Sequence, residues 1–173
     1  MNITDQLKGE HEIILRFLGI LKEACNRVQR GAFDDITFFE RCITFLREYA
    51  DSYHYDKEER VLFPAMEQAG IAYQQHRHIE HKYVYQLMAD LDRAVTANNL
   101  SAIPAPALEY TNLLEEHIIT ENKALYPEVE RVLDDHQKEE IQKEFDRIEG
   151  VITNEKDHNY IIAEVDQLEN YLP

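Results

Sequence analysis

The sequence has only two cysteines, Cys25 and Cys42, and they do not form a CxxC pair. This pattern argues against a disulfide framework, an iron–sulfur cluster and a thioredoxin-type redox motif. Two free thiols agree with a reducing compartment, so we expect a cytoplasmic protein. We expect both cysteines to pack in the core as small apolar side chains.

Long apolar runs are also lacking. No stretch approaches the roughly 18–20 apolar residues that a membrane span requires. The N-terminal stretch MNITDQLKGEH has neither the basic region nor the apolar region of a secretory signal. We therefore expect neither a membrane partner nor a secretory leader.

Basic residues are scarce relative to acidic ones. Lys and Arg total 18 against 34 Asp and Glu, which gives a net charge of −16. A chain this acidic would be repelled by phosphate backbones, so nucleic acid is excluded as the main ligand. An acidic surface suits a protein that handles cations, although solubility alone would also explain it.

Glycine and proline, with five of each, are too few to interrupt the chain often. Between them the apolar residues recur at spacings of three and four, which predicts helices. No strand is expected. The expected helices span about 4–30 (after an N-cap at Thr4), 35–70 (capped by Asp34 or Asp35), 73–98 and 106–133, followed by a shorter helical pair over 136–172.

A chain of 173 residues fits one domain with a sizeable core. Short loops between helices favour antiparallel neighbours. We therefore predict an all-α fold, an up-down-up-down four-helix bundle over residues 1–135 with a C-terminal helical extension over 136–173. The extension is expected to pack across the bundle or against another subunit, which leaves a homo-oligomer open.

One motif occurs twice. The stretch HYDKEERVLFP, residues 54–64, returns as HIITENKALYP, residues 117–127, and both fit His-x3-Glu-x3-Leu-(Phe/Tyr)-Pro. Residues four apart share one face of a helix, so the histidine and the glutamate of each copy point the same way. A single such pair is usually a solvated ion pair, but two copies at parallel positions indicate a shared role.

Each half of the chain also carries a Glu-His dipeptide, at Glu10–His11 and at Glu80–His81. Counting helical rise from the connecting loops places four histidines in one layer with the two repeated glutamates. Burying two ionised glutamates without partners would cost several kcal/mol each. Neutral imidazoles beside carboxylates bind divalent transition metals, and carboxylates from different helices can bridge two ions. The predicted metal ligands are His11, His54, Glu58, His81, His117 and Glu121.

This ordered pattern resembles the hemerythrin-like, HHE cation-binding family over about residues 4–133. The resemblance implies a four-helix bundle that holds two iron ions in a non-haem di-iron centre with an open coordination position. It further implies that His11, His54, His81 and His117 are terminal ligands and that Glu58 and Glu121 are bridging ligands. Histidine-rich sites also accept zinc, manganese or cobalt.

The sequence departs from the family pattern at two positions. Oxygen-carrying hemerythrins have a fifth histidine one turn after the third-helix ligand, where this chain has Tyr85. Many HHE domains have two consecutive histidines in the first repeat, where this chain has Tyr55 after His54. Tyr85 could coordinate metal as a phenolate; we favour a buried tyrosine that hydrogen-bonds a ligand or water.

Three functions remain open. The first is a di-iron protein that engages a small diatomic ligand, O2 or NO, for sensing, buffering or stress response. The second is a di-iron enzyme: a peroxidase, an NO reductase or an iron donor for iron–sulfur cluster repair. The third is an interaction module whose metal stabilises the bundle. The remaining histidines are expected at the surface: His76, His78, His136 and His158. Tyr53 and Tyr110 could line the site, but we expect them to pack in the core.

Overall fold

The computed structural model describes residues 2–71, 74–152 and 158–172, although the side chains of 74–81, 151–152 and 158–159 are not described. All regular structure in these residues is helical, so the predicted all-α fold is confirmed. The elements are α1 (Ile3–Gln29), α2 (Ile36–Phe45), η1 (Leu46–Tyr55), η2 (Glu58–Leu62), α3 (Phe63–Gln68), α4 (Gln74–Thr96), η3 (Leu100–Ala102), α5 (Pro104–Thr120), η4 (Glu121–Leu125), α6 (Tyr126–Val132), α7 (Asp135–Ile152) and α8 (His158–Tyr171). Of the elements labelled η, η1, η2 and η4 are π-helices and η3 is a 3-10 helix.

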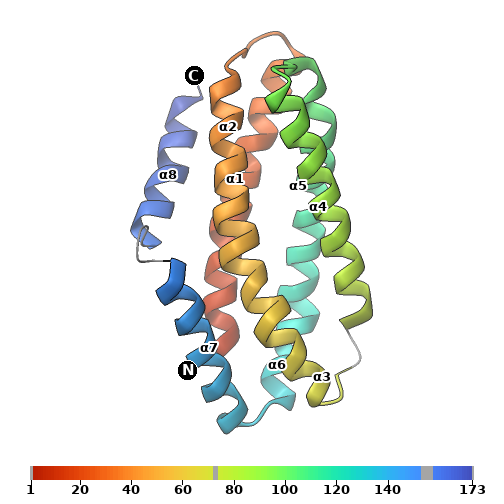
Figure 1. The fold of residues 1–173 in the computed structure, drawn as a ribbon, viewed down its shortest axis with the longest axis vertical. Helices are drawn as coiled ribbons and strands as arrows, with labels where there is room; N and C mark the ends of the chain where they lie inside the picture. The colour runs from red at the N-terminus through yellow and green to blue at the C-terminus, as the bar shows by residue number, and fades with distance from the viewer. Residues whose placement is uncertain (1, 72–73, 153–157, 173) are drawn as a thin grey trace.

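Four long helical stretches lie side by side along the molecule (Figure 1). The first is α1, the second runs from α2 through α3, the third is α4, and the fourth runs from α5 through α6. Helix α5 packs against both α1 and α4, and α4 also contacts α2. These contacts produce the helical bundle that the apolar spacing predicts.

The loops between these stretches have identifiable turn chemistry. Asp35 caps α2 as expected, because its side chain accepts the Thr37 N–H at 2.8 Å. Helix α1 begins at Ile3 rather than after Thr4, so the N-cap expected at Thr4 is wrong. Gly31 follows α1 with φ +67°, a left-handed conformation that glycine adopts without strain.

The core consists of two apolar clusters. The larger includes Phe17 and Phe45, whose rings stack at 4.2 Å, and the smaller includes Leu7, Leu62 and Phe145. The first, second and fourth helical stretches each carry buried charged or imidazole side chains at the level where the two apolar clusters meet. These polar side chains are Glu10, His11, His54, Lys57, Glu58, His117 and Glu121. A polar layer therefore crosses an otherwise apolar interior.

The C-terminal helices α7 and α8 pack on the outside of the bundle, along α1 (Figure 1). Helix α7 also contacts η1 and η2 of the second stretch. Phe145 of α7 and Val165 of α8 are fully buried, one in each apolar cluster. Side chains of the extension therefore form part of the core of this chain. Its boundary at residue 135 and its contact with a second subunit stay predictions.

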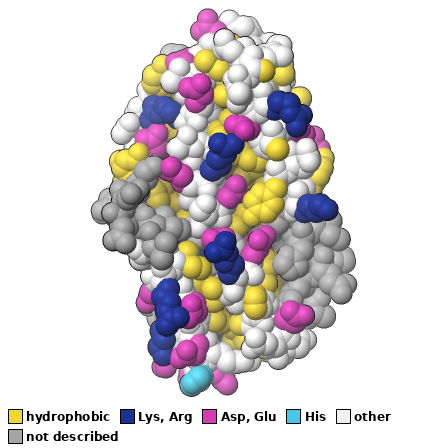
Figure 2. All heavy atoms as spheres, viewed as in Figure 1, with side chains coloured by type: hydrophobic (Ala, Val, Ile, Leu, Met, Phe, Trp, Pro, Cys, Tyr) yellow, Lys and Arg dark blue, Asp and Glu magenta, His cyan; other side chains and the backbone are white. Residues whose placement is uncertain are grey.

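The face drawn in Figure 2 carries acidic and basic side chains interspersed with apolar atoms, so the net charge of −16 is not gathered there in one patch. Among the described helices, none is both long and apolar enough to cross a membrane.

Candidate metal centre

Two wide helical turns place the repeated glutamates. The backbone N–H of Phe63 donates to the carbonyl of Glu58, and that of Tyr126 donates to the carbonyl of Glu121, each five residues back. The next residue in each copy is a proline, Pro64 or Pro127. Proline has no N–H, and its ring clashes with the carbonyl four residues earlier, so a regular α-helical turn is disfavoured at this position. The proline of each repeat therefore affects the shape of the helical turn that carries the glutamate, which gives it a structural role although it is not itself a ligand.

Four of the predicted ligands converge in the polar layer. His11, His54, Glu58 and Glu121 each offer a ligand atom within 4.8 Å of the others, and all four are buried. His11 Nε2 lies 3.3 Å from Glu121 Oε2, and His54 Nε2 lies 3.8 Å from Glu58 Oε2. Side chains from three helical stretches thus meet at one point, as the count of helical rise predicts.

The other two predicted ligands are placed differently. His117 is outside this group of four, but it is buried and its Nε2 lies 3.1 Å from Glu121 Oε1. His81 belongs to α4, and its side chain falls outside the described residues. The structure therefore gathers five of the six predicted ligands.

His54 is fixed by Glu10, a residue that the sequence analysis assigns only to the Glu-His dipeptide. His54 Nδ1 lies 2.8 Å from Glu10 Oε2. Burial by itself would raise the pKa of Glu10, but the hydrogen bond from His54 and the charge of His54 when protonated, together with the charge and the hydrogen bond of Lys57, outweigh it and lower that pKa. An ionised carboxylate only accepts hydrogen bonds, so Nδ1 carries the proton and Nε2 is left with a lone pair.

The imidazole of His54 is neutral at physiological pH. Burial, with a further contribution from the nearby His11, lowers the pKa of His54 to about 4. Its Nε2 has no hydrogen-bond partner among the described side chains, although it is buried. A buried acceptor without a donor is costly, and a cation at this position would satisfy it. The donor set of the cluster therefore fits a metal ion.

His11 has a matching arrangement. Its Nδ1 lies 2.9 Å from Asn122 Oδ1, so the amide oxygen accepts from Nδ1 and Nε2 points to Glu121. Tyr126 stacks on His11 with ring centroids 5.4 Å apart and donates its hydroxyl to Glu58 Oε1 at 2.8 Å. Burial raises the pKa of Tyr126 well above its ordinary value, so the hydroxyl keeps its proton. Outer hydrogen bonds of this kind orient metal-binding histidines.

The tyrosines at the two departures from the family pattern have different environments. The favoured interpretation of Tyr85 as a buried side chain is wrong, because it is 40% exposed. Tyr55 is buried, with its ring 6.2 Å from those of both Tyr85 and His117. Tyr53 and Tyr110 lie in the core, as expected.

Four histidines outside the predicted ligand set are expected at the surface. His136 is exposed, as expected, whereas the side chains of the other three histidines expected at the surface fall outside the described residues. Those three are His76, His78 and His158.

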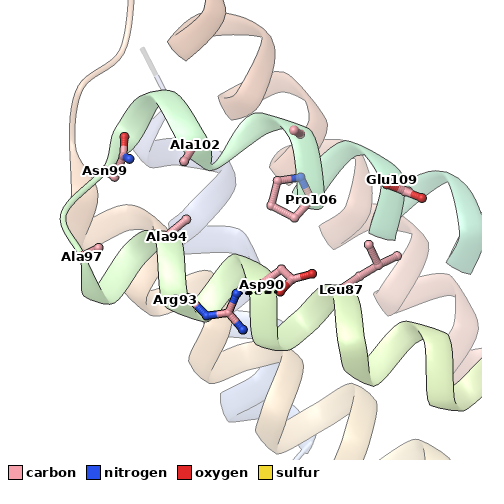
Figure 3. A pocket seen from close by; sticks show the side chains of 10 residues that line it. Leu87, Asp90, Arg93, Ala94, Ala97, Asn99, Ala102, Pro106 and Glu109 are labelled. Atoms are coloured by element: carbon pink, nitrogen blue, oxygen red, sulfur yellow. Dashed lines mark ion pairs between the residues drawn. The ribbon is translucent and has the colours of Figure 1, made fainter.

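A surface hollow of about 610 Å³ lies away from this cluster, between the end of α4 and the start of α5 (Figure 3). Its walls include Ala94 and Pro106 and the ion pair between Arg93 and Asp90 at 3.1 Å. None of the residues that line it belongs to the His/Glu cluster. The buried polar layer is thus the better candidate for cation chemistry.

Comparison with known proteins agrees with this geometry. The family model described as Hemerythrin HHE cation binding domain matches residues 2–127. No curated protein and no solved structure matches the chain. The family match and the buried His/Glu cluster together indicate a metal-binding site. Because the match covers well over half of the chain, the protein belongs to the hemerythrin HHE cation-binding family.

Proposed function

We propose that the protein is a non-haem di-iron protein that engages a small diatomic ligand, O2 or NO, for sensing, buffering or stress response. The observation that carries this proposal is the buried convergence of His11, His54, Glu58 and Glu121 within 4.8 Å. Neutral imidazoles and ionised carboxylates together form a ligand set for divalent transition metals.

In this proposal the imidazoles are terminal ligands and the two glutamates bridge the ions. The terminal ligands are His11, His54, His81 and His117, and the bridging ligands are Glu58 and Glu121. Each glutamate lies beside the histidine of its own repeat, and Glu121 also lies beside His11 of α1. Zinc, manganese or cobalt would fit the same donors, so the metal is part of the proposal.

The surroundings of the site favour a small ligand. The four clustered side chains are at most 1% exposed, and the two apolar clusters adjoin the polar layer. Bound ferrous ions would supply the electrons for reversible binding of O2 or NO. The protein side chains would exclude bulk water, and the Tyr126 hydroxyl would keep Glu58 oriented by its hydrogen bond.

The test uses protein purified without oxygen. Its iron content should approach two ions per chain, and adding O2 or NO to the ferrous protein should produce a new visible absorption band. An unchanged spectrum with both gases would contradict ligand binding. Turnover of peroxide or NO far beyond one equivalent would instead support the enzyme alternative.

We also propose a reducing, cytoplasmic location. Cys25 and Cys42 are both buried free thiols, a state typical of reducing compartments. Fractionation of cells that express the full chain checks this, and recovery in the membrane or secreted fraction would contradict it.

A further inference from the structure

A buried charge network connects the cluster to the C-terminal extension. Lys57 is fully buried, and its Nζ lies 2.7 Å from Glu149 Oε1 of α7 and also contacts Glu10 Oε1. The second oxygen of Glu10 accepts from His54 Nδ1 at 2.8 Å. The order of contacts is therefore Glu149, Lys57, Glu10 and His54.

The extension supplies an anchored end to this network. Glu149 Oε1 accepts hydrogen bonds from Lys57 Nζ, from the Tyr53 hydroxyl at 2.8 Å and from Gln6 Nε2. Lys57 Nζ also lies 3.7 Å from the centroid of the Tyr53 ring, a favourable cation–π position. Three donors thus hold one carboxylate oxygen of α7 against the bundle.

The two repeats differ at this position. Lys57 directly precedes Glu58, and the corresponding residue before Glu121 is Thr120, which is exposed. A buried lysine is tolerated only when carboxylates compensate its charge, and here one of the two carboxylates comes from α7. The charge of Lys57 in the first repeat is therefore compensated in part by a carboxylate of the extension that covers it.

We propose that Lys57 and Glu149 are positioning residues for His54, so that the extension forms part of the metal site. Glu149 shares the charge of Lys57, which leaves Glu10 free to accept strongly from His54 Nδ1 and to hold Nε2 toward the cluster. Without Glu149, Glu10 alone neutralises Lys57 and becomes a weaker acceptor for His54. Outer partners of a ligating histidine set its orientation and basicity. This inference rests on the proposed metal site.

The decisive variant is Glu149→Gln, which removes the charge and keeps the shape. Its matched control is Glu144→Gln on the same helix, because the Glu144 side chain is about half exposed (46%) and, within the described part of the chain, forms an ion pair with Arg147 at the surface. Ferrous affinity is measured by anaerobic competition with a chelator. Glu149→Gln should weaken binding about 3- to 10-fold and Lys57→Met about 10- to 100-fold, whereas the control should match the wild type.

A second measurement does not need metal. Nitrogen-15 NMR of the metal-free chain reports the tautomer of His54 and the exchange rate of its Nδ1 proton with water. That exchange should be several-fold faster in Glu149→Gln than in Glu144→Gln. If Lys57→Met does not fold, the comparison of Glu149→Gln with Glu144→Gln still tests the positioning role.

The outcomes separate the inference from the proposed function. Wild-type protein that binds no metal would contradict the proposed function, and the NMR signal of His54 then decides the inference by itself. Metal binding with equal affinity in Glu149→Gln and its control, together with an unchanged His54 proton, would overturn the positioning role and leave the metal site in place.

Discussion

Tyr126 of the second repeat donates its hydroxyl to Glu58 of the first repeat at 2.8 Å. The corresponding aromatic residue of the first repeat is Phe63, which has no hydroxyl to return the contact. The two halves of the site are therefore related in sequence but not equivalent in their hydrogen bonding.

Replacing Tyr126 with Phe should destabilise the metal-free protein by about 1–2 kcal/mol, because a buried carboxylate loses a donor. Urea denaturation of the metal-free protein measures the change. Tyr83→Phe is the control, since Tyr83 is exposed and its hydroxyl bonds Glu109 at the surface. Equal stability of the two variants would show that the contact with Glu58 contributes little.

Pro64→Ala tests the origin of the wide turn at Glu58. Alanine removes the steric clash and favours the helix interior by up to about 3 kcal/mol relative to proline. We expect the metal-free protein to melt at the same or a higher temperature while metal affinity falls, because a regular turn would rotate Glu58 away. Calorimetry and chelator competition measure both effects. Retained affinity would mean that the turn does not depend on the proline.

Replacing either proposed bridging ligand, as Glu58→Gln or Glu121→Gln, should lower the metal content from the proposed two ions per chain toward one or none. A neutral amide is a weaker ligand for a divalent cation than a carboxylate. Glu116→Gln, at an exposed position of α5, is the matched control and should retain full loading. Loading also stabilises the folded state by mass action, so the wild type should gain melting temperature with iron while the variants gain less.

Asp51 should make stability depend on pH. Burial, aided by nearby carboxylates, raises the pKa of Asp51 to about 7. The folded state therefore holds a proton that the unfolded chain releases near pH 4, and stability decreases as pH rises from about 4 to 7. Asp51→Asn should equal the wild type near pH 4 and exceed it by about 1–2 kcal/mol at pH 8, after allowing for solvent screening. A gain that is independent of pH in urea titrations would contradict this.

Phe145→Ala tests whether the extension and the bundle share one core. The side chain is fully buried in the cluster that also contains Leu7 and Leu62, so its truncation should cost about 3–5 kcal/mol. Thermal unfolding followed at helical and aromatic wavelengths should shift as one transition. The exposed Glu139→Ala should change stability by less than about 0.5 kcal/mol. Two separated transitions would favour an independent extension.

The sequence pattern was sufficient to predict the helices and most of the candidate site. Apolar spacing of three and four predicted each long helical stretch, because a helix must bury one face. The spacing of four between His54 and Glu58 predicted their common direction, and the structure brings them to one cluster with His11 and Glu121. The π turns η2 and η4 were missed, although the proline of each repeat was an available signal; the π-helix η1 was also missed, and no proline follows it directly.

The prediction that Tyr85 is buried was wrong because sequence spacing alone does not fix which way a helix faces. Its place one turn after His81 indicated a residue near the site, but α4 presents this side chain partly to solvent. Which face of a helix meets its neighbours depends on how the helices rotate against each other, and a single tyrosine carries little information about that.

The amino-acid sequence by itself determined the helical class, the repeated histidine and glutamate positions and the family to which the chain belongs. These properties depend on residue types at short spacings, where one helix fixes the geometry. Only the tertiary structure decided that Glu10 and Asn122 hold the two histidines and that Glu149 of the extension pairs with buried Lys57. Such pairs join residues far apart along the chain, and their contact depends on the packing of whole helices rather than on any local pattern.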